Sequence, residues 1–265
     1  MPTINVRGIE INYRDEGAGF PLLLIHGLSD TLTLWTPLMS EFSNYYRVIA
    51  MDVRGHGCSS KPDMPYSIGM FSEDLRGFLD RLEIPQAHLL GLSMGGAIAQ
   101  RFTLDYPESV ASLILLSSFY HCDSGLRDTL GKLREIAAEE GLAAFFDEAV
   151  KLVVSHDFVS AHREDIAEMK KICAQINSPI AIVHAIDACL EFDASDRISQ
   201  VSLPTLILSG NEDIFVPPYL AEQIHRCIRG SEWRILTGVG HNLVIPEKTL
   251  ELTRIILEFL GRLTC

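Results

Sequence analysis

A serine between glycines is the residue of this chain best placed to act as a nucleophile. Gly91-Leu92-Ser93-Met94-Gly95 has the pattern G-x-S-x-G, which is weak evidence by itself because chance matches are frequent. Here it follows an apolar run that predicts a strand over 87–90 and precedes a predicted helix. A tight turn in this setting strains the backbone of Ser93 and exposes its hydroxyl. It also directs the N–H of Met94 toward a developing oxyanion.

A serine hydroxyl also needs a general base and a group that orients that base. Of the nine histidines, His241 comes just past the final predicted strand, where its loop can return over the edge of the sheet. Asp213 follows another late strand and is the expected orienting acid. Two rivals for that role stay open: Glu212, its neighbour, and Asp123, which follows an earlier strand.

An oxyanion is held well only by two hydrogen-bond donors. The N–H of Met94 is expected to be one of them. The other is expected to be the N–H of Leu28, in the loop that follows His26-Gly27. We expect Gly27 to let the chain turn there, and His26 to hydrogen-bond the loop without taking part in the chemistry.

The elements around these residues alternate between strands and helices, which predicts an α/β fold with helices on both faces of the sheet. Continuous apolar runs such as 21–25 are typical of strands covered on both sides. The predicted strands are 3–6, 10–14, 21–25, 46–51, 87–90, 110–117, 205–209 and 232–236. The predicted helices are 68–82, a helix from the serine turn to about 105, 219–229 and 250–260.

One stretch, from about 120 to 199, has no convincing strand. It holds helical segments near 126–140, 142–154, 161–177 and 180–190, and it is far longer than an ordinary connection. We therefore expect a core formed by 1–119 and 200–265, and a helical cap formed by 120–199 over the carboxyl edge of the sheet. Extra helices packed elsewhere are the alternative.

Composition excludes several classes of partner. The net charge is −13 without any basic cluster, so nucleic acid and anionic membrane surfaces are not expected partners. No run of about 18 apolar residues is present. The beginning of the chain does not resemble a secretory signal, which favours a cytoplasmic protein. The six cysteines lack C-x-x-C spacing, so free thiols are expected and a zinc site is not. Whether the chain forms a homo-oligomer stays open.

Taken together, these segments resemble the α/β-hydrolase fold superfamily over nearly the whole chain. The resemblance implies an eight-stranded sheet, a Ser93–His241–Asp213 triad in the chain order of that fold, and no metal or organic cofactor. The matching segments are His26-Gly27-Leu28, Asp52-Val53-Arg54-Gly55-His56-Gly57-Cys58-Ser59, Gly91-Leu92-Ser93-Met94-Gly95-Gly96, Gly210-Asn211-Glu212-Asp213 and Gly240-His241.

Within the superfamily the chain looks most like the carboxylesterases and the 3-oxoadipate enol-lactonase group. Haloalkane dehalogenases and epoxide hydrolases have an aspartate nucleophile, whereas position 93 is serine. The carbon–carbon bond hydrolases of aromatic degradation usually have a glycine-rich run after the first histidine, whereas this chain has Leu28-Ser29-Asp30. Hydroxynitrile lyases of this fold have a lysine directly after the histidine, where this chain has Asn242.

The expected activity is that of a serine hydrolase that cleaves carboxylic esters of small, largely apolar substrates through an acyl-enzyme. Enol-lactonase, thioesterase, lyase or perhydrolase activity, or a ligand-binding receptor on the same fold, remain alternatives because fold alone does not choose among them. Apolar side chains near the catalytic loops are expected to form the substrate pocket, with plain core packing as the other interpretation of each. These residues are Leu28, Trp35, Phe119, Phe215 and Leu243.

Overall fold

The computed structural model describes residues 1–263, the side chains of residues 156 and 157 excepted. Eight strands form one sheet in the order β1-β2-β4-β3-β5-β6-β7-β8. The strands from β3 to β8 are parallel, whereas β2 is antiparallel to both of its neighbours. The strands are β1 (Thr3–Val6), β2 (Ile9–Glu16), β3 (Pro21–Ile25), β4 (Arg47–Met51), β5 (Ala87–Leu92), β6 (Val110–Leu116), β7 (Thr205–Gly210) and β8 (Glu232–Leu236).

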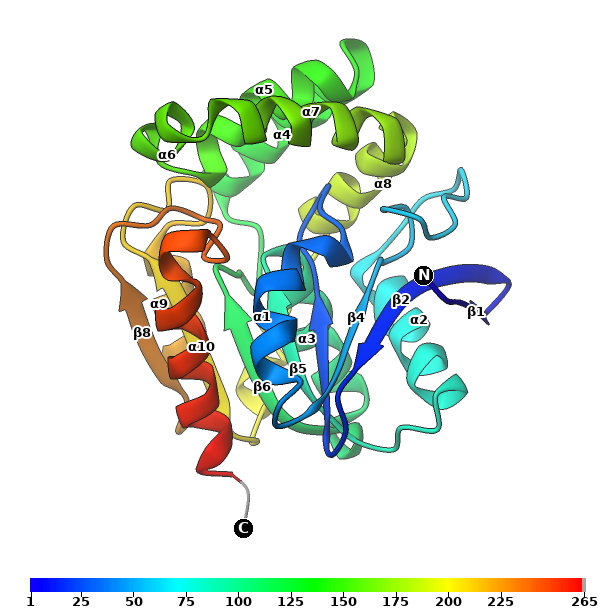
Figure 1. Ribbon diagram of the computed structural model, residues 1–265, viewed down its shortest axis with the longest axis vertical. Helices are drawn as coiled ribbons and strands as arrows, with labels where there is room; N and C mark the ends of the chain where they lie inside the picture. The colour runs from blue at the N-terminus through cyan, green and yellow to red at the C-terminus, as the bar shows by residue number, and fades with distance from the viewer. Residues whose placement is uncertain (264–265) are drawn as a thin grey trace.

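Side chains of the central strands alternate between two apolar layers. In β3, Leu22 and Leu24 pack in the layer under α1 and α10, whereas Leu23 and Ile25 pack in the layer under α2, α3 and α9. Helices thus cover both faces, as Figure 1 shows, and this explains why the strands have continuous apolar runs. The core helices are α1 (Thr36–Phe42), α2 (Ile68–Arg81), α3 (Met94–Asp105), α9 (Pro218–Cys227) and α10 (Pro246–Gly261).

The predicted sheet is confirmed, but the helices differ in three places. The prediction has no helix between 26 and 46, yet α1 lies there and buries Leu38, Met39 and Phe42 against the sheet. Helix α10 begins at Pro246 and not near 250, since proline is well suited to a first helical position. A short helix, α6 (His156–Ala161), separates two longer helices where the prediction has a loop.

Five helices are inserted between β6 and β7 and lie over the carboxyl-terminal edge of the sheet (Figure 1). We refer to them as the cap helices; the division of the chain at 119 and 200 stays a prediction. They are α4 (Ser124–Glu139), α5 (Leu142–Val153), α6, α7 (Arg163–Ile176) and α8 (Pro179–Leu190).

The cap helices fall into two groups by their packing. Leu126, Leu130 and Ile182, on α4 and α8, are buried in the same apolar cluster as one face of the sheet. Helices α5 to α7 bury far less: among their described side chains only Leu142, Phe145 and Cys173 are buried. The first pair is therefore continuous with the core, while α5–α7 form an outer roof.

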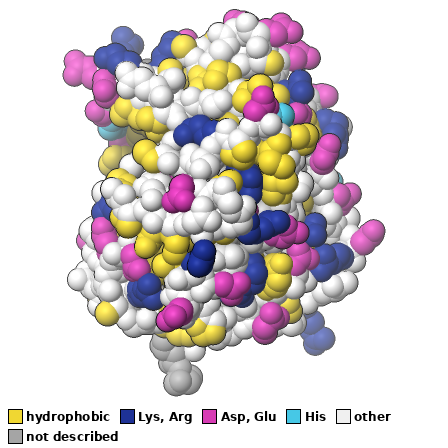
Figure 2. Space-filling view, turned by 90° about the vertical axis from the view of Figure 1, so that its right-hand side faces the viewer, with side chains coloured by type: hydrophobic (Ala, Val, Ile, Leu, Met, Phe, Trp, Pro, Cys, Tyr) yellow, Lys and Arg dark blue, Asp and Glu magenta, His cyan; other side chains and the backbone are white. Residues whose placement is uncertain are grey.

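The surface carries its charge in dispersed form. Figure 2 shows acidic and basic side chains interspersed over one face, with apolar side chains in small groups between them. Within the described residues, no single helix is long and apolar enough to cross a membrane. The helices α7 and α8 pass a test of length and composition only as a pair bent by 96°.

Candidate active site

The turn between β5 and α3 holds Ser93 in a strained conformation. Its φ of 53° and ψ of −116° lie outside the regions that a serine ordinarily occupies. Glycines make the turn possible: a Cβ at Gly91 would lie 2.3 Å from the carbonyl oxygen of Gly95, and a Cβ at Gly95 only 2.1 Å from that of Ile25. The strand-turn-helix setting expected from the sequence is therefore present, and it places Ser93 at the carboxyl edge of the sheet.

The backbone of Ser93 is fixed, while its hydroxyl is not. Its N–H donates to the Leu116 carbonyl at 2.9 Å, and its own carbonyl accepts from the N–H groups of Gly96 and Ala97 and from the Ser118 hydroxyl. The Ser93 Oγ makes no hydrogen bond with any described residue, His241 included, and Ser93 lines the cavity described below. Contacts between a nucleophile and its base commonly tighten only when substrate binds.

His241 and Asp213 meet at the same edge, from the loops after β8 and β7. The Nδ1 atom of His241 lies 2.8 Å from Asp213 Oδ2, and both side chains are buried. The other carboxylate oxygen, Asp213 Oδ1, accepts the N–H groups of Phe215 at 3.0 Å and Val216 at 2.8 Å. This fixes the carboxylate, which in turn fixes the imidazole so that its Nε2 is left to act on a proton.

The alternatives to these residues lie elsewhere. Glu212 is exposed, and Asp123 caps the N-terminus of α4 and accepts a hydrogen bond from Tyr219. His26 is buried behind the loop, where its Nδ1 contacts the Gly27 carbonyl and its Nε2 accepts the Val53 N–H. Burial lowers the pKa of His26 to about 4, so the ring stays neutral and structural.

The expected oxyanion donors are both available. Within the described chain no acceptor takes the N–H of Leu28 or of Met94. The loop that carries Leu28 is held by the buried carboxylate of Asp52, which accepts the Leu32 N–H at 2.7 Å and the Asn12 side-chain amide at 2.7 Å. A loop fixed in this way keeps a backbone donor in place without a cost during the reaction.

The expected reason for a glycine at position 27 is wrong. Its φ is not positive, so the turn itself does not require glycine. A Cβ there would lie 3.3 Å from Asp30 Oδ2 and 3.5 Å from the Ser93 Cβ. The absent side chain leaves room between the loop and the nucleophile.

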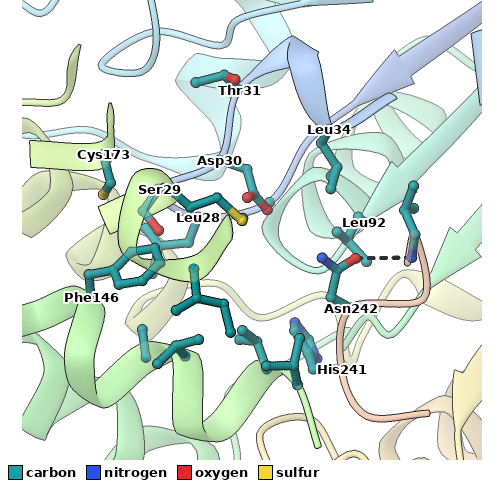
Figure 3. Close-up of a pocket in the computed structure, with 18 of the residues that line it drawn as sticks. Leu28, Ser29, Asp30, Thr31, Leu34, Leu92, Phe146, Cys173, His241 and Asn242 are labelled. Atoms are coloured by element: carbon teal, nitrogen blue, oxygen red, sulfur yellow. Dashed lines mark hydrogen bonds between the residues drawn. The ribbon is translucent and has the colours of Figure 1, made fainter. Parts of the chain in front are cut away.

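A cavity of about 410 Å³ lies between the cap helices and the sheet edge, and Ser93, His241 and Leu28 line it. This volume is in the range of pockets that hold small organic ligands. Figure 3 shows Phe146 and Cys173 from the cap helices around the same space as His241. Apolar residues dominate the lining, and none of the described residues that line it is lysine or arginine.

The predicted substrate pocket needs correction. Leu28 and Phe215 line the cavity as expected. The rings of Phe215 and His241 pack edge to face, with their centroids 4.9 Å apart. Trp35, Phe119 and Leu243 do not line it, because all three are buried in the apolar layers of the fold. For these three the plain core-packing interpretation was correct.

The predicted pocket residues include none from the cap helices, although a contribution from them was expected. Phe146, Ala149, Val150 and Val153 recur on α5 at helical spacing and line the cavity, and a similar stripe follows α7. Such stripes are a visible signal, but they predict a packed face equally well. Asp30, which also lines the cavity, was recorded only as a departure from a glycine-rich run.

Comparisons with known proteins agree with this fold. The sequence model of the alpha/beta hydrolase fold matches residues 21–248. The chain is 28% identical over 213 residues to 3-oxoadipate enol-lactonase 2 of Acinetobacter baylyi, covering 80% of this chain and 79% of that protein.

Solved structures are similar over the whole chain. A thermophilic esterase from Thermogutta terrifontis has a TM-score of 0.90 and 27% identity, covering 100% of both chains. Est816, described as an N-acyl homoserine lactone degrading enzyme, has a TM-score of 0.85 and 28% identity, covering 97% of this chain and 100% of its own. The protein therefore belongs to the α/β-hydrolase fold family.

Proposed function

We propose that the protein is a serine esterase that cleaves carboxylic esters of small, uncharged, largely apolar substrates. The observation that carries the proposal is the cavity over Ser93, which is apolar and has no lysine or arginine among its described lining residues. A carboxylate on the substrate would lose its hydration there without gaining a lysine or arginine partner. An alkyl or acyl chain would instead gain free energy by leaving water.

In the proposed mechanism, His241 takes the Ser93 proton as Oγ adds to the ester carbonyl. Asp213 holds the imidazole in the required tautomer and stabilises its cation. The N–H groups of Leu28 and Met94 hold the oxyanion, and loss of one such donor typically costs about 3–4 kcal/mol of transition-state stabilisation. The alcohol leaves with the proton from His241, and water then hydrolyses the acyl-enzyme by the same route.

Cavity chemistry separates the alternatives suggested by relatives. A lactone formed from an oxoadipate keeps one free carboxylate, and the described residues of the lining include no lysine or arginine to pair with it. His162, which also lines the cavity, is already paired with Asp165 and Glu247. An uncharged acyl lactone of the kind named for Est816 meets no such penalty, so it is the second candidate substrate. Both reactions use the same nucleophile and the same oxyanion donors.

The test is a series of p-nitrophenyl esters from acetate to decanoate, assayed with the wild type and with Ser93→Ala. We expect kcat/KM to rise with chain length and then fall as the chain outgrows the cavity. Ser93→Ala should abolish turnover and keep its circular dichroism spectrum. Activity retained by Ser93→Ala, or activity on carboxylate-bearing lactones alone, would overturn the proposal.

A further inference from the structure

An acidic side chain faces the cavity beside the catalytic loops. Asp30 follows Leu28 and Ser29 in the loop after β3, and Figure 3 shows its carboxylate turned into the space between Leu28 and Leu34. Burial raises the pKa of Asp30 to about 6, although nearby His241 acts in the opposite direction. Asp30 is partly exposed, and it is one of the residues that line the cavity.

This carboxylate has no donor of its own. No described side chain or backbone N–H donates a hydrogen bond to Asp30, and the described residues that line the cavity include no lysine or arginine. Carboxylates removed from bulk water are ordinarily paired or hydrogen-bonded, so an open acceptor of this kind is costly unless a ligand satisfies it.

Three neighbouring polar groups, by contrast, already have partners. The Thr31 and Thr33 hydroxyls bond to each other at 2.7 Å, and Asn242 Oδ1 accepts the Val244 N–H. The other acid of the lining, Asp165, is largely exposed at the mouth beside His162. Asp30 is therefore the acidic acceptor that a ligand in the interior would meet.

Asp30 also lies close to the nucleophile. Its Oδ2 and the Ser93 Cβ both border the space that a Cβ on Gly27 would occupy, at 3.3 Å and 3.5 Å from that point. A group on the carbon next to the scissile carbonyl is only two bonds from the carbon that Ser93 attacks. With a hydrogen bond of about 2.9 Å, such a group is within reach of Asp30.

We propose that Asp30 is a specificity-determining residue that accepts a hydrogen bond from an uncharged N–H or O–H group next to the scissile carbonyl. The preferred substrates are then N-acylamino or hydroxy esters and lactones whose apolar chain lies under the cap helices. This assignment rests on the proposed esterase function. It adds a polar requirement to a pocket that is otherwise apolar, and such requirements discriminate strongly because an unmatched buried group is left unpaired.

The chemistry of the surroundings favours an uncharged donor over an ammonium group. An ammonium group has three donors to satisfy, and among the described residues of the lining Asp30 is the single acid away from the mouth of the cavity. Taking a cation out of water costs several kcal/mol, which one partly covered carboxylate does not repay in full. An amide N–H or a hydroxyl has one donor and a much smaller cost of transfer.

The experiment compares methyl N-hexanoylglycinate with its N-methyl counterpart, in which a methyl group replaces the amide hydrogen and removes the donor. We expect the wild type to favour the N–H ester by about tenfold to a hundredfold in kcat/KM. Asp30→Leu should bring that ratio close to one, and Asp30→Asn, which keeps one acceptor oxygen, should give an intermediate ratio. Thr33→Val, at the same lining, is the matched control and should keep the wild-type ratio.

Several outcomes would overturn the assignment. A kcat/KM ratio near one for the wild type, or an equal ratio for Asp30→Leu and the wild type, would show that Asp30 does not recognise the N–H group of the substrate. Faster hydrolysis of norleucine methyl ester, which carries an ammonium group at pH 7, would indicate a cation site instead. Failure of the esterase proposal is distinguishable, because it would remove the Ser93-dependent hydrolysis of simple p-nitrophenyl esters as well.

Discussion

Single residues of the site differ in whether their hydrogen bonds are already made. Asp213 has both oxygens occupied, by two backbone N–H groups and by His241. Asp30 and the Ser93 hydroxyl have no such partner among the described residues. The first arrangement fixes His241, the proposed general base, before substrate arrives, and the second leaves groups free to interact with the proposed substrate.

Asp213→Asn tests the tautomer argument. The amide oxygen would keep the Phe215 and Val216 N–H groups, so its NH₂ would face His241 Nδ1. That nitrogen would then have to accept, which moves the ring proton to Nε2 and disables the base. We expect kcat for a p-nitrophenyl ester to fall about 10⁴-fold. Glu212→Gln, at the exposed neighbour, is the matched control and should be unchanged; a comparable loss there would contradict the assignment.

Asp30→Asn should change stability with a definite sign. The pKa of Asp30 is raised from 3.8 to about 6, so the folded state disfavours the charged form and stability is lost as pH rises through that interval. Removing the charge should raise the free energy of unfolding at pH 8 by about 1–2 kcal/mol, discounted because part of the group faces cavity water. At pH 4 the variant and the wild type should unfold at the same urea concentration. If the variant and the wild type were equally stable at pH 8 as well as at pH 4, the raised pKa of Asp30 would be contradicted.

Elements of the fold place the site by bringing strand ends together. Ser93, Asp213, His241 and Leu28 come from the loops after β5, β7, β8 and β3, which are parallel and end at one edge of the sheet. Strands of this kind are recognisable in a sequence as short apolar runs that end at glycine and polar residues. The loops that follow them are therefore predictable in position, which is why the triad candidates could be named from the sequence.

The cap helices were harder to interpret for a physical reason. An apolar stripe on a helix predicts only that this face is covered, and the covering group can be another helix or a bound molecule. On α4, Leu126 and Leu130 are buried in the core cluster, whereas on α5 Phe146 and Val150 face the cavity. The two helices have similar patterns, so only the fold separates packing from lining.

Asn177 joins the roof to the loops beneath it. It lies directly after α7, donates to the Ser29 carbonyl at 2.9 Å, and accepts the Gly57 N–H at 3.2 Å. Asn177→Leu would leave both backbone groups without their partner, so we expect a loss of about 2–4 kcal/mol in the free energy of unfolding. Amide exchange in α7 should also become faster.

A second bridge from the cap helices provides the control for that variant. His184 contacts Asp63 across 3.1 Å, and the Asp63 side chain is 69% exposed. Exposed contacts of this kind contribute little, so His184→Gln should change stability by at most about 0.5 kcal/mol. If both variants lose the same stability, the special role of Asn177 is wrong.

At the scale of the whole molecule, buried histidines contribute to the response of the protein to acid. Burial lowers the pKa of His26 to about 4, of His56 to about 3 and of His88 to about 4. Each binds a proton more readily in the unfolded chain, whose pKa is 6.5, than in the folded one. Stability is therefore complete above about pH 6.5 and falls as the pH drops below it, by about 2 kcal/mol per histidine at pH 5.

The acid response can be measured by urea unfolding at pH 7.5 and pH 5. His88 is the residue of choice because it lies in β5 away from the cavity, with its Nδ1 on the Ser112 hydroxyl. His88→Gln should reduce the difference in unfolding free energy between the two pH values by about 2 kcal/mol. An unchanged difference would show that His88 is charged in the folded protein.

The whole molecule also explains where prediction from sequence ends. The eight strands, the helices on both faces of the sheet and the triad candidates were predictable from local patterns, because each strand is a short apolar run and the candidates follow the ends of such runs. The shape and charge of the cavity depend on which cap helix faces which loop, and that contact joins residues more than a hundred positions apart, such as Asn177 and Ser29. Trp35 and Leu243 were wrongly predicted to line the pocket, because proximity to a catalytic loop in sequence does not determine which face of the sheet a side chain covers.

The central claim is that Ser93 is the acylated nucleophile, and covalent labelling tests it most directly. The protein would be treated with a fluorophosphonate that carries an alkyl chain, and the intact mass and the labelled peptide would be measured. We expect one adduct per chain, located on Ser93, with loss of p-nitrophenyl ester hydrolysis in the same proportion. Absence of the adduct, or full ester hydrolysis by a protein labelled at Ser93, would contradict the claim.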